Sequence, residues 1–166
     1  MKRFIRDTRR WLWLGLVAAL PLSVGCAAAG LGGQPVEAPH PVVDALFGDA
    51  RTTESLKQLA ALVELNEGEA FKLTEIGRDG RSSHHLVAIR DREDPHRHDT
   101  HDLFVFIVRG YGTMRIGNEA RPVGEGSVLY VPRGTVHAFR NTSPEPAIAY
   151  AIYSPPFDGK DKVPAE

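Results

Sequence analysis

From Glu69 onward, the chain consists of short runs of apolar and β-branched residues separated by turn residues. The linkers are rich in Gly, Pro and Asn, as in "GRDG" and "NTSPEP", and no helical periodicity spans them. Runs at this spacing are typical of the strands of antiparallel sandwiches and barrels. We predict strands at residues 71–76, 83–89, 103–108, 113–116, 128–131, 136–139 and 147–153. The expected fold class is therefore all-β, an antiparallel barrel.

The segment before the barrel, residues 42–68, has a mixed pattern. Thr52 and Thr53 are suited to cap a helix, because apolar residues recur at helical spacing from Leu56 to Val63. The alternative is a helical turn that gives way to a strand at residues 62–65. In either case we expect a short, partly helical N-terminal segment.

Residues 1–25 have the three-part layout of an export signal. Five Lys or Arg residues and one acidic residue lie within the first ten positions, and an apolar stretch and small residues follow. Cys26, the only cysteine, ends the small-residue zone. The stretch "LSVGC" resembles the lipobox of bacterial lipoproteins, although Ser23 stands where that family prefers Leu. The alternatives are an ordinary secretory signal and an uncleaved apolar helix.

The lipobox resemblance implies a protein attached by a lipid on Cys26 to the bacterial cell envelope, on its periplasmic side. The alternative location is soluble in the periplasm or secreted. Removal of the basic leader leaves a mildly acidic chain. Such a chain lacks the basic surface that binding to the phosphates of nucleic acid requires. The expected parts are the signal peptide (1–25), a flexible tether (26–41), the N-terminal segment (42–68), the barrel (69–155) and a C-terminal tail (156–166).

Three histidines lie close together in "DPHRHDTHD", namely His96, His98 and His101. Residues two apart project to the same face of an extended segment, so His96 and His98 can bind one metal ion. The remaining ligands must come from elsewhere in the chain. The alternative interpretation is a set of solvated histidines at a charged strand end.

Residues 126–141 read G-x5-P-x-G-x2-H-x3-N, which matches the second sequence motif of the cupin superfamily at every defined position. The first cupin motif, G-x5-H-x-H-x3,4-E-x6-G, is matched in part by His96, His98 and Gly110. The chain thus resembles a single-domain cupin of the type-2 kind. The resemblance implies a jelly-roll barrel, or double-stranded β-helix, with His96, His98 and His137 as metal ligands.

The glutamate of the first motif is missing, because Leu103 occupies its register. Strand alternation places His101 on the same face as Leu103, so we predict His101 as the fourth ligand. Asp102 fits the shorter motif spacing but points to the opposite face. It is the alternative ligand, or a residue that orients an imidazole through a hydrogen bond. Three or four imidazoles favour a divalent transition metal: Zn, Fe, Cu or Ni.

Two functions are compatible with these features, because the cupin fold supports both enzymes and binding modules. One is a metal-dependent enzyme of the dioxygenase or lyase/isomerase type that acts on a small organic molecule. The other is a non-catalytic module that binds a metal or small ligand at the cell envelope. Glu75, Arg90 and Tyr150 are the candidates for an additional acid or base. The cupin resemblance also implies a homodimer.

Overall fold

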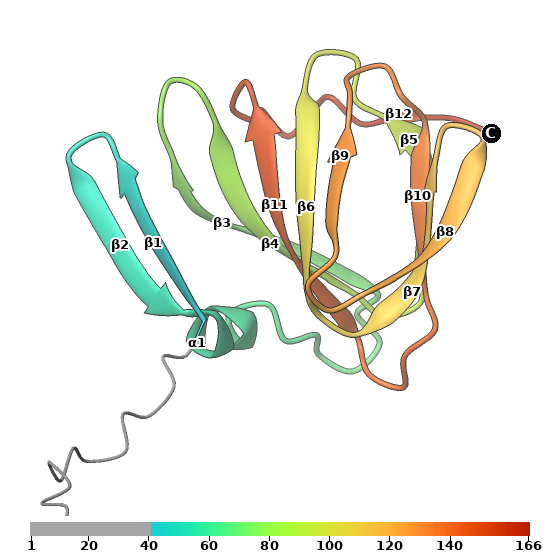
Figure 1. Cartoon of the computed structure of the whole chain (residues 1–166), viewed down its shortest axis with the longest axis horizontal. Coiled ribbons are helices and arrows are strands. Elements are labelled where there is room, and N and C mark those ends of the chain that lie inside the picture. The colour runs from blue at the N-terminus through green and yellow to red at the C-terminus, as the bar shows by residue number, and fades with distance from the viewer. Residues whose placement is uncertain (1–40) are drawn as a thin grey trace, which may run out of the picture. The chain divides into compact units, whose positions relative to one another are not determined.

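The computed structural model describes residues 41–166 (Figure 1). Cys26, the predicted signal peptide and nearly all of the predicted tether lie outside these residues. Among the described residues, no helix has the length and apolar character needed to cross a bilayer. The elements are β1 (Val42–Phe47), β2 (Ala50–Ser55), α1 (Leu56–Ala61), β3 (Phe71–Arg78), β4 (Ser83–Ile89), β5 (Arg92–Arg97), β6 (Asp102–Arg109), β7 (Tyr111–Ile116), β8 (Glu119–Gly124), β9 (Val128–Val131), β10 (His137–Asn141), β11 (Ala147–Ser154) and β12 (Val163–Pro164).

Two five-stranded sheets form the barrel, with strand orders β3-β4-β11-β6-β9 and β12-β5-β10-β7-β8. The strand pairs within both sheets are antiparallel, and the two sheets face each other in Figure 1. The all-β, jelly-roll prediction is confirmed. Side chains from both sheets fill the space between them, including Val87, Leu103, Met114 and Phe139.

The central strands β4 and β11 are buried on both faces, which explains their nearly continuous apolar sequences. Their outer face packs against the segment that precedes the barrel. Leu59 and Val63 lie in one buried cluster with Leu86, Ala88 and Ile148. The N-terminal segment therefore covers part of the sheet.

The helix prediction in this segment was correct in kind but wrong at its start. Thr52 and Thr53 lie in the β1–β2 hairpin, where β-branched residues are favourable. The helix cap is Ser55, whose hydroxyl accepts a hydrogen bond from the backbone N–H of Gln58. The strand alternative at residues 62–65 is also wrong, because no strand lies there.

The turns of the second motif have the conformations that their glycines permit. Gly126 and Gly134 have φ values of 80° and 77°, in the left-handed region that L side chains rarely adopt. The N–H of Gly134 donates to the backbone carbonyl of His98 at 2.6 Å. This turn therefore joins the second motif to the first, just before the chain enters β10.

Candidate metal centre

Three histidines converge in the interior of the described structure. His96 on β5 lies directly opposite His137 on β10, and His98 follows the end of β5. Their exposed fractions are only 2–3%. One ring nitrogen from each residue can be chosen so that all three lie within 4.8 Å of one another. The structure thus brings together the three histidines that the cupin resemblance implies.

Backbone carbonyls orient all three rings. The Nδ1 atoms of His96, His98 and His137 donate, in that order, to the carbonyls of Asp94 (2.9 Å), Asp161 and Thr135 (3.1 Å). A carbonyl only accepts, so each Nδ1 carries a hydrogen, and the neutral ring keeps a lone pair on Nε2. The Nε2 atoms of His98 and His137 are buried with no hydrogen-bond partner among the described residues. This arrangement fits a metal ion, because metal-ligating histidines donate their other ring nitrogen in this way.

The environment of His98 and His137 favours their neutral form. Burial lowers the pKa of His137 to about 4, and the neighbouring His96 lowers it further, while the Glu93 carboxylate opposes the shift. Burial also lowers the pKa of His98. Because a metal ion binds the unprotonated nitrogen, both ligands are ready for binding at neutral pH without losing a proton.

A small apolar cavity of about 50 Å³ adjoins His137. Its wall consists mostly of aliphatic and aromatic side chains from both sheets. The polar groups on its wall come from Glu93, His137 and Tyr153. Burial raises the pKa of the Tyr153 hydroxyl, so this group remains a hydrogen-bond donor. The cavity has room for only a few heavy atoms.

His101 is buried but belongs to a different contact. Its Nδ1 lies 2.5 Å from the Asp161 carboxylate, and its Nε2 lies 3.2 Å from the Pro156 carbonyl. Both partners are acceptors that engage the ring nitrogens, and His101 is not among the described histidines whose ring nitrogens lie close enough to share one metal ion. In this arrangement His101 is not available as the fourth ligand that strand alternation predicts. Strand alternation correctly predicted an inward-facing His101 side chain. It could not identify the Asp161 carboxylate and the Pro156 carbonyl that this ring contacts.

Asp102 faces Arg133 rather than a histidine. Its carboxylate accepts from the backbone N–H of Arg133 at 2.9 Å and from the guanidinium at 2.8 Å. These hydrogen bonds lower the pKa of Asp102 to about 2. The expected role of Asp102 as a ligand or as the partner of an imidazole therefore has no support in this geometry.

The three proposed acid–base candidates lie away from the cavity. Glu75 pairs with Arg78. Arg90 donates to a backbone carbonyl in the segment before β3. The Tyr150 hydroxyl contacts the His84 ring at 2.7 Å. None of the three candidates lines the cavity, so the structure does not support their expected role.

Sequence reasoning missed the contribution of the C-terminal residues. The expected tail contains β12, which pairs with β5 beside His96. Phe157 is buried and stacks on Tyr153, with ring centroids 4.7 Å apart. Asp161 accepts hydrogen bonds from the loop after β5, including those from Thr100 at 2.8 and 2.7 Å. Although burial opposes the shift, these bonds lower the pKa of Asp161 below its usual range.

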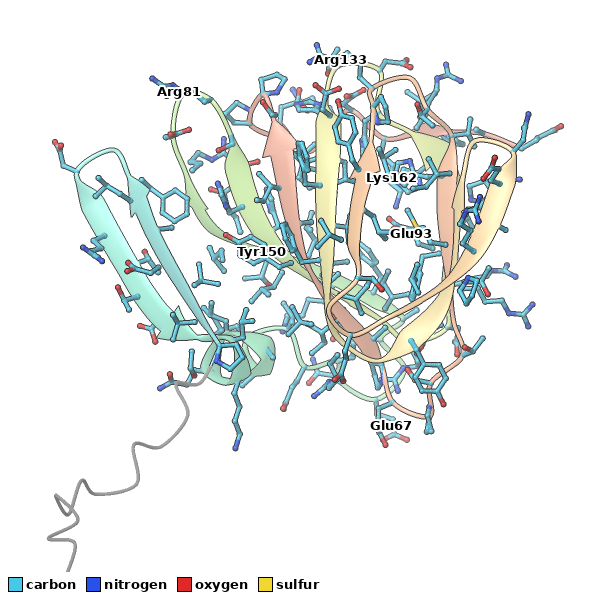
Figure 2. The ribbon with its side chains drawn as sticks, in the orientation of Figure 1. Glu67, Arg81, Glu93, Arg133, Tyr150 and Lys162 are labelled. Atoms are coloured by element: carbon cyan, nitrogen blue, oxygen red, sulfur yellow. The ribbon has the colours of Figure 1, made fainter. Side chains whose placement is uncertain are left out.

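Glu93 was also missed, although it lies only three residues before His96. Its carboxylate oxygen lies 3.6 Å from the Nε2 of His96 and 2.7 Å from the Nζ of Lys162. Figure 2 shows Glu93 and Lys162 close together beside β10, away from Arg133 at the rim. A count of residues from the H-x-H motif in an ideal strand would have turned Glu93 to the opposite face.

Comparisons with known proteins agree with this geometry. The Cupin domain family model matches residues 84–153. An uncharacterized protein of Aquifex aeolicus (strain VF5) is 36% identical over 115 residues, which are 68% of this chain and 94% of that protein.

Two solved structures share the fold at lower identity. TT1209 from Thermus thermophilus has a TM-score of 0.55 and 24% identity over 63% of this chain and 97% of that chain. Streptomyces PAC13, determined with uridine, has a TM-score of 0.51 and 20% identity over 62% of this chain and 84% of that chain. Both likenesses concern the fold alone. Together with the family match and the sequence relative, they establish that this chain belongs to the cupin superfamily.

Proposed function

We propose that this protein is a metal-binding cupin that holds a divalent transition metal, Zn, Fe, Cu or Ni, through His96, His98 and His137. The observation that carries the proposal is the common orientation of the three rings: each Nδ1 donates to a backbone carbonyl. Two of the Nε2 atoms are buried without a partner among the described residues. In a purely structural histidine cluster, we would expect hydrogen-bond partners for these Nε2 atoms, because burial of an unpaired polar atom is costly.

The cavity supports an enzymatic role on a small organic molecule. When bound, the metal supplies Lewis-acid or redox chemistry. Tyr153 can donate a hydrogen bond to a ligand in the cavity, and the Glu93 carboxylate can accept a proton from it. The apolar wall excludes water and accommodates a short hydrocarbon portion. These features suit a dioxygenase-like or lyase/isomerase-like reaction, and PAC13, determined with uridine, illustrates a small molecule associated with this fold.

A non-catalytic metal- or ligand-binding module is the second candidate. The small cavity volume, about 50 Å³, favours it, because few substrates fit without movement of the wall. The Glu93–Lys162 ion pair also occupies the carboxylate that an acid–base step would use. Both candidates share the same metal site.

We further propose that the domain is tethered to the cell envelope through a lipid on Cys26, on the periplasmic side. Support for this proposal comes from the leader sequence and its lipobox resemblance. A binding or catalytic domain held in this way would meet small molecules that enter the envelope.

Elemental analysis tests the metal proposal directly. Protein purified from its native envelope should contain one transition metal ion per chain, and His137→Ala should contain almost none. Asn141→Ala is a matched control from the same strand, because Asn141 binds the Arg90 and Glu145 carbonyls rather than the histidines. Equal metal content in the wild-type and His137→Ala proteins would exclude the proposed site.

A further inference from the structure

An irregularity in β5 turns Glu93 toward the histidines. His137 pairs with His96 and Phe139 pairs with Glu93, so two steps along β10 correspond to three steps along β5. This register shift is a β-bulge, which bends the strand and re-aims side chains. Pro95, which has no N–H to donate, lies within the irregular stretch. The bulge explains how Glu93 and His96 share a face despite their odd spacing.

The contact between Glu93 and His96 joins two groups that can share a cation. The Glu93 Oε1 lies 3.6 Å from the His96 Nε2. Because the His96 Nδ1 donates to the Asp94 carbonyl, the Nε2 of the neutral ring is an acceptor, as is the carboxylate. Two acceptors at this separation are stabilised by a shared cation, which is either a proton on the Nε2 or a metal ion. In a tetrahedral site with bonds of about 2.1 Å, neighbouring ligand atoms lie about 3.4 Å apart.

Lys162 supplies a positive charge to the same carboxylate oxygen. Its Nζ lies 2.7 Å from the Glu93 Oε1 and 5.1 Å from the centre of the Phe71 ring. The Lys162 side chain is 45% exposed, so it can leave this position for solvent at little cost. Glu93 itself is 19% exposed and lines the cavity beside the histidines.

We propose that Glu93 is the fourth protein ligand of the metal held by the three histidines, and that Lys162 competes with the metal for its carboxylate. This inference rests on the proposed metal function and deepens it. The carboxylate missing after the H-x-H motif is thus supplied from before it, by the bulge in β5. Three imidazoles and one carboxylate form a harder ligand set than imidazoles alone, which favours Fe or Zn over Cu.

Cobalt titration of the metal-free full-length chain tests this assignment, because Co²⁺ absorption in the visible range reports the ligands as well as the affinity. Glu93→Gln should weaken Co²⁺ binding by about 10-fold or more and change the visible spectrum. Lys162→Met should strengthen binding, because the carboxylate loses its competitor. A gain in affinity cannot come from misfolding, so this second variant keeps the test decisive. Glu119→Gln is the matched control: its exposed carboxylate on β8 pairs with Arg121, away from the histidines, and this variant should bind as the wild type does.

The possible failures are distinct. Tight wild-type binding that Glu93→Gln leaves unchanged in affinity and spectrum would overturn the role of Glu93 but not the histidine site. Weaker Co²⁺ binding by Lys162→Met would overturn the competition. Wild-type and His137→Ala chains that bind Co²⁺ equally weakly would overturn the proposed metal function itself.

Discussion

The Glu93 carboxylate and the His96 Nε2 face each other at 3.6 Å from positions three apart on one strand. A regular strand would place them on opposite faces, and the β-bulge between β5 and β10 places them on the same face. The position of Glu93 beside the candidate metal centre therefore depends on a local departure from regular geometry. The following predictions separate the residues that contact this centre from those that support it.

Asp102→Asn should leave metal affinity unchanged. The substitution removes only the charge that pairs with Arg133, a pair whose guanidinium partner is half exposed. The expected loss of unfolding free energy is small, because solvent screens the ion pair. Metal titration together with chemical denaturation measures both quantities. A tenfold loss of metal affinity would show that Asp102 does act on the site.

His101→Ala should reduce stability more than it reduces metal affinity. The substitution leaves the buried Asp161 carboxylate without its ring partner, although hydrogen bonds from Thr100 remain. We expect a loss of about 2 kcal/mol, below the usual cost of breaking a buried pair. Metal affinity should fall less than in His98→Ala. Loss of metal as complete as in His98→Ala, with unchanged stability, would instead identify His101 as a ligand.

The metal-free protein should lose stability as the pH falls from 7 toward 4. The pKa of His137 is about 4 in the folded state, against an ordinary value of 6.5. Between these values the unfolded chain takes up a proton that the folded chain does not, so acid favours unfolding. This residue alone should contribute about 2 kcal/mol between pH 7 and pH 5. Chemical denaturation at both pH values should show a smaller difference for His137→Gln, and an identical difference would contradict the prediction.

Tyr130→Lys should weaken the expected homodimer. Tyr130 and Val128 are 48% and 61% exposed on β9, which is an edge strand of its sheet. Apolar side chains on an exposed edge favour pairing with another chain, and a lysine opposes it. Analytical ultracentrifugation should show more monomer for Tyr130→Lys than for wild type. Tyr111→Lys, an equally exposed control on β7, should behave as the wild type.

Cys26→Ser should move the mature protein from the detergent fraction to the soluble periplasmic fraction. The reason is that Cys26 is the only cysteine and ends the small-residue zone of the leader. Fractionation followed by immunoblotting measures the distribution. A variant that stays in the membrane would indicate that the apolar stretch of the leader is itself the anchor.

The barrel was predictable because its strands are short, apolar and bounded by strong turn residues. The predicted boundaries 83–89 and 128–131 agree with β4 and β9. The strands that were missed have weaker patterns. Glu119–Gly124 is mostly exposed, and Arg92–Arg97 is charged and interrupted by Pro95. Their pairing in the sheet, rather than their own composition, makes them strands.

The residues of the candidate site that belong to sequence motifs were predictable. Those that depend on tertiary contacts were not. His96, His98 and His137 follow from motif spacing. Glu93 depends on a bulge, which alternation cannot anticipate. The partner of His101 lies 60 residues along the chain, in a segment with no sequence signal of its own. Local patterns do not reveal such long-range acceptors.

The carbonyl that orients His98 belongs to Asp161, 63 residues further along the chain. A growing polypeptide can therefore contain all three histidines well before it contains a complete binding site. In the proposed metal site, the His98 ring would gain its orienting carbonyl only after synthesis has passed Asp161 and β12 has docked on β5. If the chain is exported before it folds, the metal supply of the receiving compartment, and not that of the cytoplasm, would decide which ion the proposed site acquires.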